Sequence, residues 1–77
     1  MTDLETRLIH LAAKRFDKDA AGLGAADDFF EKLGIDSYQA MDMLTEVEEA
    51  FDVEIPDYEL NGVNTFGGLA ELIGRRL

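Results

Sequence analysis

Ser37 is the clearest candidate for covalent chemistry, and it is the only serine among the 77 residues. It follows Asp36 at the expected start of a helix, just after a turn that contains Gly34. A hydroxyl in that place is exposed, and the amino-terminal end of a helix favours an attached or approaching phosphate. Asp and Ser are also frequent capping residues, so the pair taken by itself is more often structural than chemical.

A second kind of chemistry is offered by the acidic stretch from Asp17 to Asp28. Its first residues resemble the opening of an EF-hand calcium loop, with Asp28 at the twelfth position. However, Ala21 supplies no side-chain oxygen where Asp or Asn is expected, and Asp28 is shorter than the usual bidentate Glu. A calcium-binding loop is therefore kept only as an alternative.

Catalysis by the chain itself has little support. His10 is the only histidine and lies far from Ser37 in the sequence, and no nucleophile elbow or oxyanion motif accompanies the serine. Tyr58 is more readily interpreted as a packing or surface residue than as a general acid. There is no cysteine, which excludes a thiol nucleophile and a thiolate metal site. We expect no enzyme activity and no metal.

The net charge of −10 is unevenly distributed. No Lys or Arg occurs between residues 33 and 74, whereas ten acidic residues do. Such a surface repels nucleic acid and steers basic protein surfaces towards it, although acidic residues can also serve solubility alone. We expect protein partners with basic patches and no nucleic acid.

The composition is that of a small globular domain, with 47% hydrophobic residues. No apolar run approaches the roughly 18 residues of a membrane span, and the N-terminus lacks the apolar region of a signal peptide. We expect residues 1–77 to form one domain, monomeric and cytoplasmic, without stable membrane association.

Periodicity predicts an all-α fold, a small four-helix bundle with three longer helices, a short third helix and a long first loop. The first helix should start at a capping box of Thr2 and Glu5 and end near residues 15–17. Residues 17–36 are expected to form the loop. Four apolar side chains should pin it to the core, namely Phe29, Phe30, Leu33 and Ile35.

The second helix should begin at Asp36 and Ser37, with a possible capping box to Gln39. Its buried stripe is expected to contain Ala40, Met43, Leu44, Val47, Ala50 and Phe51, with acidic residues on the outer face. Residues 57–61 should form the short third helix after Pro56. Asn64 or Thr65 should cap the fourth, whose apolar face runs from Phe66 to Leu77.

Three motifs, in this order, resemble the acyl carrier protein family of phosphopantetheine-binding carriers. The family pattern is G-x-D-S-L, then E-E-x-F, then E-I-P-D/E. Here the motifs read Gly34-Ile35-Asp36-Ser37-Tyr38, Glu48-Glu49-Ala50-Phe51 and Glu54-Ile55-Pro56-Asp57. The similarity covers essentially the whole chain.

The resemblance implies that Ser37 accepts 4′-phosphopantetheine from coenzyme A through a phosphopantetheinyl transferase, and that Asp36 helps to present it. It implies a docking face for basic patches of acyl-transferring, synthase or ligase enzymes, made of Tyr38, Met41, Asp42, Glu46, Glu48 and Glu49. It also implies core positions that can shelter an acyl chain: Phe29, Phe30, Ala40, Val47, Leu60, Val63 and Leu69.

A member of this family would carry acyl intermediates as thioesters in fatty-acid, polyketide or related specialised lipid biosynthesis. Tyr38 replaces the usual leucine, which favours a specialised pathway. The alternative is an aminoacyl or peptidyl carrier, but those often have G-G-D-S and a less acidic helix, whereas Ile35 fills the second glycine position here.

Overall fold

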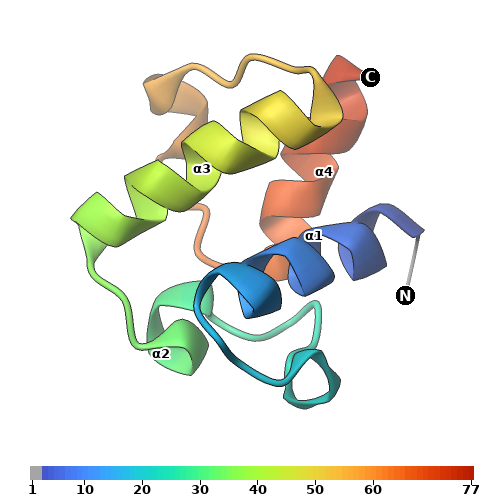
Figure 1. The fold of residues 1–77 in the computed structure, drawn as a ribbon. Coiled ribbons are helices and arrows are strands. Elements are labelled where there is room, and N and C mark those ends of the chain that lie inside the picture. The colour runs from blue at the N-terminus through green and yellow to red at the C-terminus, as the bar shows by residue number, and fades with distance from the viewer. Residues whose placement is uncertain (1–2) are drawn as a thin grey trace.

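A computed structural model describes residues 3–77, apart from the side chain at position 57, and the regular elements of that part are all helical (Figure 1). The α-helices are α1 (Asp3–Arg15), α2 (Phe29–Leu33), α3 (Ser37–Phe51) and α4 (Phe66–Arg76). Two 3₁₀ turns join them, η1 (Ala20–Gly22) and η2 (Asp57–Leu60). The all-α prediction is confirmed. The capping box expected at Thr2 lies outside the described residues.

The segment expected to be a loop contains the short helix α2, which was not predicted. Asp28 caps it, since its Oδ1 accepts hydrogen bonds from the backbone N–H groups of Phe30 and Glu31 at 2.8 and 3.1 Å. Gly34 ends it in the left-handed conformation, with φ of 66°. Five residues are too few to show a helical period, so only these caps indicate the helix.

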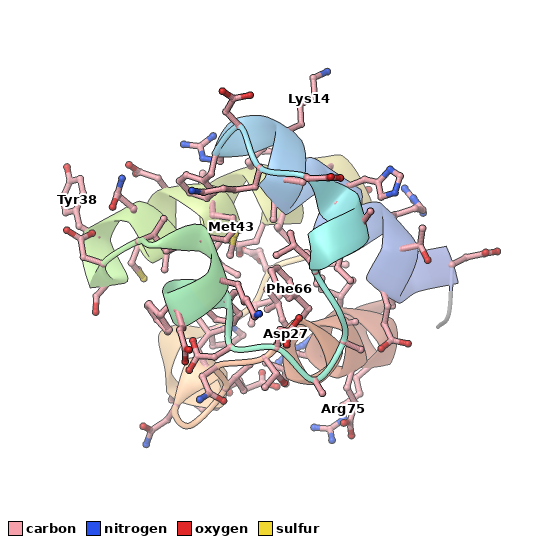
Figure 2. The ribbon with its side chains drawn as sticks, turned by 90° about the horizontal axis from the view of Figure 1, so that it is seen from below. Lys14, Asp27, Tyr38, Met43, Phe66 and Arg75 are labelled. Carbon is pink, nitrogen blue, oxygen red and sulfur yellow. The ribbon has the colours of Figure 1, made fainter. Side chains whose placement is uncertain are left out.

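The core lies between α1, α3 and α4, and α2 lies near the end at which α3 begins (Figure 1). Figure 2 shows Met43 and Phe66 in the interior, whereas Tyr38 extends outwards. Of the four expected pins, Phe30 is half-buried and the other three are buried. Ala50 is exposed, contrary to expectation, because it lies one helical turn beyond Glu46 on the outer face.

The start of α4 is tied to the long connection. Thr65, rather than Asn64, caps α4, because its Oγ1 accepts a hydrogen bond from Gly68 N at 3.0 Å. Asn64 instead donates from Nδ2 to Asp28 Oδ2 at 3.0 Å, and its carbonyl accepts from Phe29 N at 2.9 Å. These bonds hold the start of α2 beside the start of α4.

Candidate functional site

Ser37 is the first residue of α3, and a capping box holds it there. Asp36 Oδ1 accepts a hydrogen bond from Gln39 N at 2.8 Å, and Gln39 Oε1 accepts one from Asp36 N at 3.3 Å. The predicted capping box is therefore confirmed. Ser37 is exposed, so its hydroxyl is accessible to another enzyme. The free N–H groups of the first helical turn favour negative charge beside it.

The turn before Ser37 is anchored on both sides. Gly34 adopts the left-handed conformation, which costs glycine little, and the next backbone N–H, of Ile35, donates to Phe30 O at 3.1 Å. The side chain of Ile35 is buried. The chain therefore leaves α2 and enters α3 at a fixed angle, which keeps Ser37 at the surface.

An apolar cavity of about 140 Å³ has Ser37 in its wall. The other lining residues are Phe29, Phe30, Ala40, Met41, Met43, Leu44, Leu60, Val63 and Leu69. Six of the seven residues expected to shelter an acyl chain are among them. Val47 is not among them, and its side chain is completely buried in the core.

Met43 and Leu44 were not among the residues expected to shelter an acyl chain. Their spacing of three and four residues from Ala40 places them on the same face of α3, which is the signal that could have found them. An apolar cavity of roughly 150 Å³ can hold a group as small as benzene. A long acyl chain would therefore require the surrounding side chains to move apart.

The acidic residues of α3 are not equivalent. Asp42 and Glu49 are exposed. Glu48 is half-buried, and its Oε2 accepts a hydrogen bond from Ile55 N at 2.9 Å, which ties the turn after α3 to the helix. Glu46 is paired with Arg15. Of the expected docking residues, two acids thus have partners within the fold.

Two apolar side chains of the expected docking face are exposed. Tyr38 is 77% exposed and Met41 49%, and they lie three residues apart on one face of α3. Met41 also lines the cavity. It therefore stands between the interior and the outer surface near Ser37.

His10 and Asp28, the residues on which the alternative functions depend, lie in different surroundings. His10 is exposed on α1, an element that does not line the cavity containing Ser37. Both carboxylate oxygens of Asp28 are engaged, by the start of α2 and by Asn64. Among the side chains that the structure describes, no group of three or more His, Asp or Glu could hold a metal ion. Within residues 3–77, no helix is long and apolar enough to cross a membrane.

Comparison with known proteins gives the family. A family model described as a phosphopantetheine attachment site matches residues 6–73. The acyl carrier protein of Phenylobacterium zucineum strain HLK1 is 30% identical over all 77 residues, which cover 98% of that protein. The chain therefore belongs to the family of acyl carrier proteins that bear 4′-phosphopantetheine. The predicted family, carrier function and cofactor are confirmed.

The start of α3 fits this cofactor. The hydroxyl of Ser37 is exposed, the helix end favours a phosphate, and an apolar cavity lies alongside. One oxygen of Asp36 is engaged in the cap. When bound, the arm supplies a thiol that carries the acyl group as a thioester. This cysteine-free chain has no thiol of its own.

Proposed function

We propose that Ser37 is the residue that bears the phosphopantetheine arm. The observation that carries the proposal is that the only serine of the chain is exposed at the first position of α3, in the wall of the apolar cavity. The transferase would join Ser37 Oγ to the phosphate of the phosphopantetheine half of coenzyme A and release adenosine 3′,5′-bisphosphate. Asp36 would hold the helix start and present Ser37.

The partner enzymes are proposed to dock on α3. Exposed carboxylates at Asp42 and Glu49 attract basic surfaces over a distance, and Tyr38 and Met41 offer apolar contact beside Ser37. Such docking speeds association without a large buried area, which suits a carrier that visits several enzymes. The expected partners are a phosphopantetheinyl transferase and acyl-transferring, synthase or ligase enzymes.

We further propose that the cargo is an acyl group of a specialised lipid or polyketide pathway, sheltered in part by the cavity beside Ser37. The buried Ile35 at the position of the second glycine of peptidyl carriers, and the acidic α3, both favour an acyl over an aminoacyl carrier. The chain itself is proposed to act without catalysis, as one monomeric domain in the cytoplasm.

The test is the intact mass of the protein after incubation with coenzyme A, magnesium and a panel of phosphopantetheinyl transferases. Wild type should gain one phosphopantetheinyl group and Ser37→Ala none. Thr45→Ala is the matched control, because it removes an exposed hydroxyl of α3 that donates a hydrogen bond to Met41 O at 3.1 Å. A gain in Ser37→Ala, or none in wild type across the panel, would contradict the proposal.

A further inference from the structure

Arg15, the last residue of α1, reaches across to α3. Its Nη1 lies 2.5 Å from Glu46 Oε2, and the two side chains are 34% and 43% exposed. The guanidinium Cζ is also 5.9 Å from the centroid of the Phe16 ring, within the range of a cation–π contact. The guanidinium therefore contacts both Glu46 on α3 and the adjacent Phe16 ring.

The surroundings of Arg15 are the acidic face of α3. One shallow surface cleft is lined by Arg15, Asp42, Thr45, Glu46 and Glu49. The three acids stand at spacings of four and three residues and therefore share one helical face. The neighbouring acidic cleft further along α3 has no cation in its wall; it is lined by Thr45, Glu48, Glu49, Asp52, Val53 and Glu54.

The three acids differ in whether another residue of the chain already pairs with them. Within the described part of the chain, no ion pair engages Asp42 or Glu49, whereas Glu46 is already bound. A lysine or arginine of a partner can approach the first two directly. At Glu46 it competes with a guanidinium that is always charged and already contacts Oε2.

We propose that Arg15 is a specificity-determining residue that competes with basic partner surfaces for Glu46, an inference that rests on the proposed docking function of α3. Partners that contact Asp42 and Glu49 bind without this competition. Partners that direct a lysine to Glu46 bind more weakly, by about two- to fivefold, the range that exposed ion pairs contribute. Arg15 thereby narrows the set of enzymes that the acidic face accepts.

The test uses a hexalysine peptide as the basic probe and the full chain as the receptor. Its Kd is measured at low ionic strength, where surface charges are least screened, for wild type, Arg15→Gln and Lys14→Gln. Lys14 is the matched control, because it is exposed on the same helix, extends into solvent (Figure 2), and its substitution changes the net charge equally. Arg15→Gln should tighten binding about two- to fivefold more than Lys14→Gln.

The same comparison is repeated in a Glu46→Gln background, where the excess effect of Arg15→Gln should disappear. Equal effects of the two substitutions in the wild-type background would overturn the proposal. So would an excess that persists without Glu46, because Arg15 would then act only as a nearby positive charge. The peptide assay does not depend on Ser37, so failure of phosphopantetheine attachment and failure of this proposal are distinguishable.

Discussion

Replacing Asp36 by alanine should loosen the start of α3 and with it the position of Ser37. Asp36 Oδ1 accepts from Gln39 N at 2.8 Å, and the return bond from Asp36 N to Gln39 Oε1 is 3.3 Å long. Alanine removes the acceptor, so the N–H of Gln39 has only water as a partner and the first turn frays. Asparagine retains a side-chain oxygen at the same place and should keep the cap.

The expected cost follows from the geometry of the cap. Loss of an N-cap acceptor costs about 0.5–2 kcal/mol, and typically about 1 kcal/mol. Both residues are exposed, so water replaces part of the lost bond and the lower half of that range applies. With about 0.05–0.15 kcal/mol per residue, a chain of this size has only roughly 4–12 kcal/mol of stability. A loss of about 0.5–1.25 kcal/mol should lower Tm by roughly 2–10 °C.

Urea unfolding followed by circular dichroism would measure the free energy of unfolding of wild type, Asp36→Ala and Asp36→Asn. We expect Asp36→Asn to stay within about 0.5 kcal/mol of wild type, because Asn and Asp are similar N-cap residues. The rate of transferase modification should be higher for Asp36→Asn than for Asp36→Ala. If alanine left the free energy of unfolding unchanged, or asparagine lowered it as far as alanine, the capping box would not be what fixes α3.

Three further substitutions test other parts of the structure. Ala40→Phe should fill the cavity, so that an octanoyl cargo no longer raises Tm above that of the holo form, as measured by differential scanning fluorimetry. Gly34→Ala should lower the free energy of unfolding in urea by about 1–2 kcal/mol, because φ is 66°. Gly22→Ala, where an added Cβ likewise meets open space, should lower it less. Glu48→Ala should cost about 1 kcal/mol by losing its bond to the backbone after α3, and the exposed Glu49→Ala less than 0.5 kcal/mol.

Much of the site could be read from local sequence. The start of α3 depends on residues that are close in the chain: Asp36 and Gln39 form the capping box, and Gly34 lies in the turn before it. The types of these residues alone therefore predicted where α3 begins. Helix α2 was missed because its five residues show no period, although Asp28 and Gly34 mark its two ends. The 3₁₀ turn η2 ends at Leu60, one residue earlier than expected.

The sequence by itself determined the helical fold, the acidic face of α3 and the single serine at its start, because periodicity, caps and composition are local properties. Only the tertiary structure decided which acids remain available. Glu46 is bound by a residue 31 positions away and Glu48 by a backbone group seven positions away. It likewise decided that Val47 is core while Leu60 and Val63 reach the cavity. These outcomes depend on the distances between helices after packing, and side-chain spacing along one helix does not encode those distances.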